Sequence, residues 1–166
     1  MAATWVQIQY YSAYHGNSKL DRQRALDYVK AIKAACFLND LDQERYFAQV
    51  AWESSFVNGI RDRKLAFHSW SYGLSGIQIE TAFRLIHSRI TGRDLIMDFE
   101  LNLILGARQM RHLIDKAGGD LHKAEMAYNA GWNGMIRGGG KTYPSSLDAT
   151  ERKWEKFKKE YSVPML

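Results

Sequence analysis

Glu53 is the carboxylic acid in this sequence whose surroundings best suit acid catalysis. Val50, Ala51 and Trp52 precede it, and Phe56 follows it. A carboxyl group among such apolar neighbours should lose hydration, which favours its neutral, proton-donating form. Cleavage of a glycosidic bond requires a proton donor of this kind. The alternative is a surface glutamate that only borders the core, and these neighbours alone do not exclude it.

A glycine-rich segment, residues 71–79, carries side chains that could bind a sugar. It reads Ser-Tyr-Gly-Leu-Ser-Gly-Ile-Gln-Ile. Gly73 and Gly76 would let the backbone approach a sugar ring where a side chain would collide, although each also suits a plain turn. Gln78 could exchange hydrogen bonds with sugar hydroxyl or acetamide groups, or it could support the turn through backbone hydrogen bonds.

A second segment, residues 127–131, reads Ala-Tyr-Asn-Ala-Gly. Tyr128 and Asn129 end a predicted short helix that would face Glu53 across a cleft. The alternative for Tyr128 is a core aromatic whose hydroxyl is satisfied inside the protein. Ser54, next to Glu53, could orient the reacting sugar or cap the backbone.

Four motifs in chain order resemble those of the soluble lytic transglycosylases of the lysozyme superfamily (the SLT domain, glycoside hydrolase family 23). Each motif alone is weak, but four in the family's order form a specific signal that spans about residues 42–140. They are Glu-Ser-x-aromatic at 53–56, the glycine-rich segment 71–79 followed by Thr-Ala at 81–82, Asn-Leu at 102–103, and Ala-Tyr-Asn-Ala-Gly at 127–131.

The resemblance implies a single catalytic acid, Glu53. It would protonate the oxygen between MurNAc and GlcNAc and then take the proton from the sugar's own 6-hydroxyl, leaving a 1,6-anhydroMurNAc end without water. The resemblance also implies Tyr128 beside the acid and Asn129 on the substrate's N-acetyl group. The substrate-binding residues that we expect are Ser54, Ser71, Gly73, Gly76, Gln78, Tyr128 and Asn129.

No cofactor or metal site is expected, because the histidines lack the spacing of metal ligands. Two other functions remain open. A second carboxylate, with Asp62, Asp94 and Asp98 as candidates, would make the protein a hydrolytic, goose-type lysozyme. A protein that keeps the lysozyme fold without catalysis would instead be a wall-binding or structural virion protein.

The elements that must position these residues are predicted to be mostly helical. Residues 57–72 interrupt the helical pattern and suggest a loop with at most a small hairpin. Its basic side chains, Arg61, Arg63 and Lys64, could meet muramyl carboxylates or serve only solubility. Apolar residues at helical spacing predict helices over 21–38, 42–54, 79–91, 94–117, 121–129 and 146–161.

We therefore expect a mainly α, lysozyme-like α+β fold with the active-site cleft between helices. A single domain over residues 1–166 would comprise an N-terminal helical part (1–41), the core motifs (42–140) and a C-terminal helix (141–166). The 166 residues are 46% hydrophobic and 25% charged, which is ordinary for one globular domain. Cys36, the only cysteine, is expected to be a buried structural thiol.

The net charge of +5 suits an anionic partner such as a bacterial cell wall. No dense run of Lys and Arg with interleaved aromatics indicates nucleic acid. Residues 1–20 lack the pattern of a secretory signal peptide, and no apolar segment reaches transmembrane length. We expect synthesis in a host cytoplasm and action on the wall as a phage virion component or released endolysin. The expected partners are glycan strands and phage tail or other virion proteins, without nucleic acid or membrane insertion.

Overall fold

The computed structural model describes residues 22–58, 60–62 and 70–160, which form helices and one small sheet. In chain order the elements are α2 (Arg22–Asn39), α3 (Gln43–Ser54), β1 (Ile60–Asp62), β2 (Trp70–Tyr72), α4 (Ile79–Ile86), α5 (Gly92–Met97), α6 (Phe99–Lys116), α7 (Leu121–Ala130), α8 (Trp132–Ile136) and α9 (Tyr143–Glu160).

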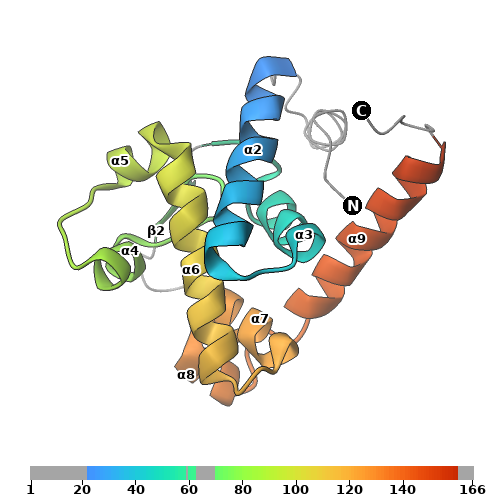
Figure 1. Cartoon of the computed structure of the whole chain (residues 1–166). Helices are drawn as coiled ribbons and strands as arrows, with labels where there is room; N and C mark the ends of the chain where they lie inside the picture. Colours follow the sequence, from blue (N-terminus) through green and yellow to red (C-terminus); the bar gives the residue numbers. More distant parts are fainter. Residues whose placement is uncertain (1–21, 59, 63–69, 161–166) are drawn as a thin grey trace.

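The long helix α6 runs through the middle of the molecule, and the other helices are arranged around it (Figure 1). Helix α2 packs along α6, α4 and α5 pack against it on one side, and α7 packs against its C-terminal part. Helix α9 contacts α3 and α7. The expected mainly helical architecture, with a small sheet, is confirmed. Within the described ranges, no helix is long and apolar enough to cross a membrane.

A buried apolar cluster between α2, α3 and α6 holds the largest part of the core. Tyr28 and Ile32 of α2, Phe47 of α3 and Leu103 of α6 all belong to it. Cys36 lies in the same cluster and is 1% exposed, as predicted. Burial, with a smaller contribution from the negative charge of Asp42, raises the pKa of the Cys36 thiol to about 12. The faces of α3 and α6 that point into this cluster are fixed by packing. Their remaining faces are available to line a functional site.

The single helix predicted over 94–117 is wrong, because the structure has two helices there. Asp98 separates α5 from α6 with a non-helical backbone (φ −105°, ψ 85°). Its side chain accepts a hydrogen bond from the backbone N–H of Leu101, so it caps the start of α6. The helix predicted over 79–91 also ends earlier, at Ile86, because His87 adopts a left-handed conformation with φ 51°.

The region predicted as a loop contains the expected small hairpin. Strands β1 and β2 pair antiparallel, with Arg61 opposite Ser71. Arg63, Lys64 and the rest of 63–69 lie outside the described residues, as do 1–21 and 161–166. The proposed role of that basic loop and the single-domain boundaries therefore stay predictions.

The last helix begins three residues earlier than predicted, at Tyr143 rather than at 146. Pro144 stands in its first turn, where a proline's fixed φ suits a helix and its missing N–H is not needed. The earlier start places Tyr143 on a helix that packs against α3, the helix of Glu53.

Candidate active site

Glu53 lies in the last turn of α3 and is 6% exposed. The helix ends there because Ser55 and Phe56 both adopt left-handed backbone conformations, with φ 49° and 57°. The Ser54 hydroxyl supports this turn by donating to the carbonyl of Val50 at 2.9 Å and accepting from the Phe56 N–H at 3.1 Å. Two successive residues in a sparsely populated region give the chain a sharp exit from the helix, right after the candidate acid.

The carboxyl group of Glu53 has a polar partner from the far end of the chain. Tyr143, at the start of α9, donates a hydrogen bond from its hydroxyl to Glu53 Oε1 at 2.6 Å. Tyr143 is 3% exposed, so this contact is shielded from water. A short hydrogen bond between buried groups holds the carboxyl group in one orientation.

The other carboxyl oxygen lies against Gly76. A Cβ built on Gly76 would stand 2.8 Å from Glu53 Oε2, closer than real Cβ atoms approach an oxygen. Gly76 also has φ 62°, a conformation that favours glycine. The glycine is therefore required twice, once for the turn and once for the space that the acid occupies.

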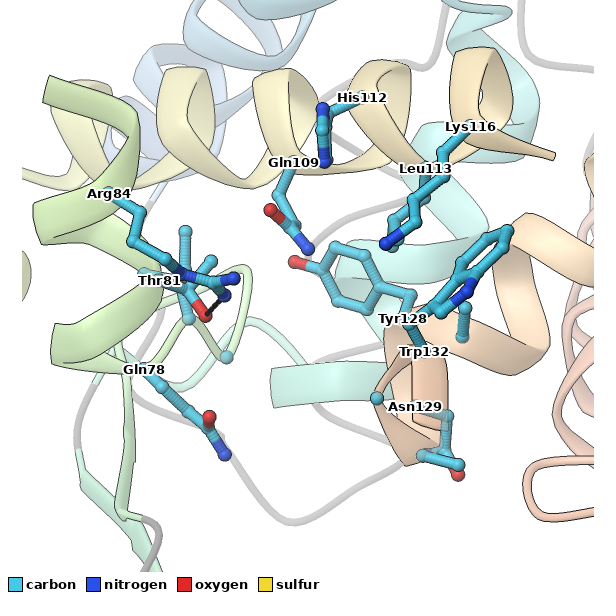
Figure 2. Close-up of a pocket in the computed structure, with 15 residues that line it drawn as sticks. Gln78, Thr81, Arg84, Gln109, His112, Leu113, Lys116, Tyr128, Asn129 and Trp132 are labelled. Atoms are coloured by element: carbon cyan, nitrogen blue, oxygen red, sulfur yellow. Dashed lines mark hydrogen bonds between the residues drawn. The ribbon is translucent and has the colours of Figure 1, made fainter. Parts of the chain in front are cut away.

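A pocket of about 480 Å³ opens beside Gly76, between α4, α6 and the α7–α8 corner (Figure 2). Gln78, Tyr128 and Asn129 line it together with Gly76. Glu53 lies next to this pocket, because its Oε2 lies against Gly76. The pocket is large enough for about one sugar residue with its substituents.

Asn102 holds the glycine-rich turn in place from α6. It is completely buried, and its Oδ1 accepts from both the backbone N–H and the hydroxyl of Ser75 at 2.9 Å. Its Nδ2 donates to the carbonyl of Tyr72 at 2.8 Å. Gly73 packs so closely on the Asn102 side chain that a Cβ at residue 73 would overlap it. The side-chain amide of Asn102 therefore bonds to the turn that carries Gly76 on both sides, at Tyr72 and at Ser75.

We expect Asn102→Ala to lower the free energy of unfolding by about 3 kcal/mol, because it leaves the buried N–H of Ser75 unpaired and removes one of the two hydrogen bonds that the Tyr72 carbonyl accepts. Urea unfolding would measure the change. Asn133→Ala, at an exposed position of α8, is the matched control and should cost less than about 1 kcal/mol. Equal midpoints for the two variants would show that the amide does not hold the turn.

A partly buried ion-pair cluster links the N-terminal half of α9, the helix that carries Tyr143, to the helix of Glu53. Arg45 of α3 bonds Glu125 of α7 at 2.7 Å, Asp148 of α9 at 2.7 Å and Glu151 at 3.0 Å. The Glu125 side chain is only 2% exposed, and Arg45 is the cation that pairs with its buried carboxylate. The cluster therefore connects three helices around the site at one residue.

The sequence of the chain matches a protein-family profile over residues 30–148, a stretch that includes Glu53, Gly76, Tyr128 and Tyr143. The profile is that of the transglycosylase SLT domain. The chain belongs to this family. No curated protein significantly matches the chain.

This SLT domain is also similar in structure to lytic transglycosylase Slt from Pseudomonas aeruginosa, solved by X-ray crystallography as an inactive mutant with one glutamate replaced by glutamine. The TM-score is 0.56 and the sequence identity is 22%. The match covers 76% of the chain but only 20% of the Pseudomonas chain, so the SLT domain spans about a fifth of that protein's length. At this identity the likeness shows a shared fold.

The SLT domain brings some of the expected site residues together and leaves others apart. Gly76, Gln78, Tyr128 and Asn129 line one pocket, and Gln78 makes no side-chain bond that caps α4. Ser54, Ser71 and Gly73 do not line it. Ser54 and Ser71 are buried, and the Ser54 hydroxyl bonds backbone atoms, which is the capping role that the sequence left open.

The resemblance placed Tyr128 beside the catalytic acid, but the structure has two tyrosine hydroxyls in this region with different partners. The Tyr128 hydroxyl donates to the carbonyl of Ser75 at 2.9 Å, so it helps to hold the glycine-rich turn. The hydroxyl found on Glu53 is that of Tyr143. Sequence reasoning missed Tyr143, and the only local signal for it was the Pro144 that follows, which favours a helix start at this point.

We expect Tyr143→Phe in this SLT domain to lower kcat about tenfold and to leave KM unchanged. The substitution removes one hydrogen bond that orients the candidate acid, and Tyr143 is not among the residues that line the pocket. Steady-state turnover of soluble glycan strands would measure both constants. Tyr46→Phe is the matched control, because it removes another buried tyrosine hydroxyl bonded at 2.6 Å, to the carbonyl of Leu103. If both variants keep full kcat, Tyr143 does not position the acid.

Proposed function

We propose that this SLT domain is a peptidoglycan lytic transglycosylase with Glu53 as its one acid and base. The observation that carries the proposal is the buried carboxyl group of Glu53, bonded to Tyr143 at 2.6 Å and lying against a glycine that lines a sugar-sized pocket. Membership of the SLT family supports it, as does the glutamate-to-glutamine mutation that accompanies inactivity in the Pseudomonas protein.

The proposed reaction uses the two carboxyl oxygens differently. Tyr143 donates to Oε1, so Oε2, on the side of Gly76, is the oxygen that we assign to proton transfer. Glu53 protonates the glycosidic oxygen between MurNAc and GlcNAc, and the bond from that oxygen to the anomeric carbon of MurNAc breaks. The MurNAc acetamide assists at the anomeric carbon, and Asn129 would hold that acetamide in the pocket.

The second half of the reaction returns the enzyme to its starting state. Glu53, now a carboxylate, takes the proton from the 6-hydroxyl of the same MurNAc, and the 6-oxygen bonds the anomeric carbon. The products are a strand with a free GlcNAc end and a strand with a 1,6-anhydroMurNAc end. No water enters the products.

A hydrolytic reaction would need a second carboxylate to activate water. Asp94 and Asp98 both serve as helix caps: Asp94 forms a capping box with Thr91, and Asp98 caps α6. The hydrogen bonds from Thr91 lower the pKa of Asp94, which suits a cap. Asp62, on β1, remains as the candidate for the goose-type alternative.

Analysis of the products by mass spectrometry tests the proposal. Purified sacculi would be digested in water enriched in heavy oxygen, and the released fragments would be weighed. A lytic transglycosylase leaves ends that are lighter than hydrolysed ends by one water and that carry no label. Labelled, heavier ends would establish the lysozyme alternative. Binding to sacculi without any released fragment would establish the non-catalytic, wall-binding alternative.

The biological setting is a separate part of the proposal. A small, basic domain of this activity suits a bacteriophage that opens the wall during infection or lysis. Antibodies against the protein would detect it in purified particles if it is a virion component with tail or other virion partners. Its presence only in lysates of infected cells would instead indicate a released endolysin.

A further inference from the structure

Three basic side chains line the pocket beside Gly76. Arg84 projects into it from α4, and His112 and Lys116 project from α6 (Figure 2). No aspartate or glutamate is among the residues that line this pocket. Away from Glu53, which lies beside Gly76, a sugar-sized pocket lined by cationic and not by acidic groups favours a ligand that carries negative charge.

The geometry keeps these basic side chains at the pocket. His112 and Lys116 are four residues apart on α6 and so share one helix face. The Lys116 amino group stands 4.4 Å from the centre of the Trp132 ring, and Arg84 donates to the Thr81 hydroxyl at 3.2 Å. Within the part of the chain that the structure describes, neither Arg84 nor Lys116 forms an ion pair. Their charge is therefore available to a ligand.

The chemistry of the proposed substrate offers one kind of partner for these charges. The sugar rings of a glycan strand carry hydroxyl and acetamide groups, which are neutral. Negative charge is found only on the lactyl substituent of MurNAc. Where no stem peptide is attached, the lactyl carboxylate carries the charge. Where a stem peptide is amide-linked to that carboxyl group, the carboxylates of the peptide carry it. The planar guanidinium group of Arg84 can donate two parallel hydrogen bonds to a carboxylate, and the ammonium group of Lys116 can form an ion pair with one.

We propose that Arg84 and Lys116 form an anion subsite that selects glycan strands through a carboxylate on the muramyl substituent. This inference rests on the proposed function for the polymer that fills the pocket. The face of the Trp132 ring holds the Lys116 amino group at one side of the pocket, and Arg84 reaches the pocket from the opposite side (Figure 2). A flexible substituent that enters between them can place a carboxylate against either cation. Strands without the carboxylate bind only through the sugar contacts of Gln78, Tyr128 and Asn129.

Calorimetric binding in a Glu53→Gln background, which prevents turnover, tests the subsite. Three probes are compared: uncross-linked strands with stem peptides, strands stripped by an amidase so that the lactyl carboxylate is free, and peptide strands with all carboxylates converted to carboxamides. We expect the carboxamide strands to bind about tenfold more weakly than their parent, because each solvent-exposed ion pair contributes modestly. At about 1 M salt, where the Debye length is about 3 Å, that difference should nearly disappear.

A double variant, Arg84→Gln with Lys116→Gln, should bind all strands as the parent protein binds the carboxamide strands. The matched control, Lys30→Gln with Arg108→Gln, removes the same charge from exposed positions outside the pocket and should keep the tenfold preference. If the stripped strands bind as tightly as the peptide strands, a free lactyl carboxylate is sufficient as the ligand. If they bind as weakly as the carboxamide strands, only the carboxylates of the stem peptide are recognised. If the double variant and the control show the same ratio of affinities for carboxylate and carboxamide strands, the proposed subsite is wrong.

Binding and cleavage are measured separately, so the two proposals can fail separately. If wild-type protein releases no anhydro ends but the double variant still loses its preference for carboxylates, the proposed reaction is wrong and the anion subsite stands. If anhydro ends are released and the preference is unaffected by the double variant, the reaction stands and the subsite is wrong.

Discussion

Glu53→Gln is expected to abolish the release of fragments from peptidoglycan and to leave the fold intact. The amide oxygen can still accept the hydrogen bond from Tyr143, and the side chain keeps its volume in a position that is 6% exposed. The amide cannot donate an acidic proton or later accept one. Because both halves of the proposed reaction use the same group, we expect the rate to fall by about a thousandfold or more.

Turbidity loss of a sacculus suspension measures the activity, and far-UV circular dichroism with a thermal melt checks the fold. Glu100→Gln is the matched control, since it makes the same chemical change at an exposed position of α6. That control should keep full activity. Lysis by a well-folded Glu53→Gln protein at more than a few per cent of the wild-type rate would remove Glu53 from its assigned role.

Gly76→Ala is expected to lower activity about a hundredfold with only a modest loss of stability. The new Cβ would stand 2.8 Å from Glu53 Oε2, so the carboxyl group must shift out of its hydrogen-bonded position. A displacement on the order of 1 Å at a reacting group costs about a hundredfold in rate. Alanine at φ 62° adds strain of about 1–2 kcal/mol to the folded state.

Gly118→Ala separates the steric effect on the acid from the backbone strain. Gly118 has nearly the same conformation, φ 66°, but nothing lies within 4 Å of the position of its Cβ. Both variants should lose similar stability in a urea melt, and only Gly76→Ala should lose activity. If the two variants are equally active, the contact between residue 76 and the acid is unimportant and the placement of Oε2 for proton transfer is wrong.

The helices could be predicted where their periodicity was strong and their caps were close by. Helix α7 begins after its cap Asp120 at the predicted residue 121, and α3 begins after its cap Asp42, within one residue of the predicted start. The apolar positions of 94–117 continue through Asp98 at helical spacing, so periodicity alone could not reveal the break there. The break depends on the backbone of one residue, whose side chain prefers to cap the next helix.

The order of the motifs was sufficient to predict the family, the fold class and the identity of the candidate acid, because short-range signals carry that information. The motifs also marked Gly76, Gln78, Tyr128 and Asn129, which the structure gathers around one pocket. The roles of the serines could not be predicted in the same way. Whether a hydroxyl such as that of Ser54 meets a sugar or a backbone carbonyl depends on burial, which residue type does not specify.

The partner of the acid required the tertiary structure. Tyr143 is ninety residues from Glu53, and its hydroxyl reaches Oε1 only because α9 packs across α3 and the Arg45 cluster holds it there. Arg84 and Lys116 likewise line the same pocket only because α4 and α6 both border it. Local sequence therefore determines which elements form and which residues can do chemistry, whereas contacts between distant segments determine which of those residues act on the same atoms.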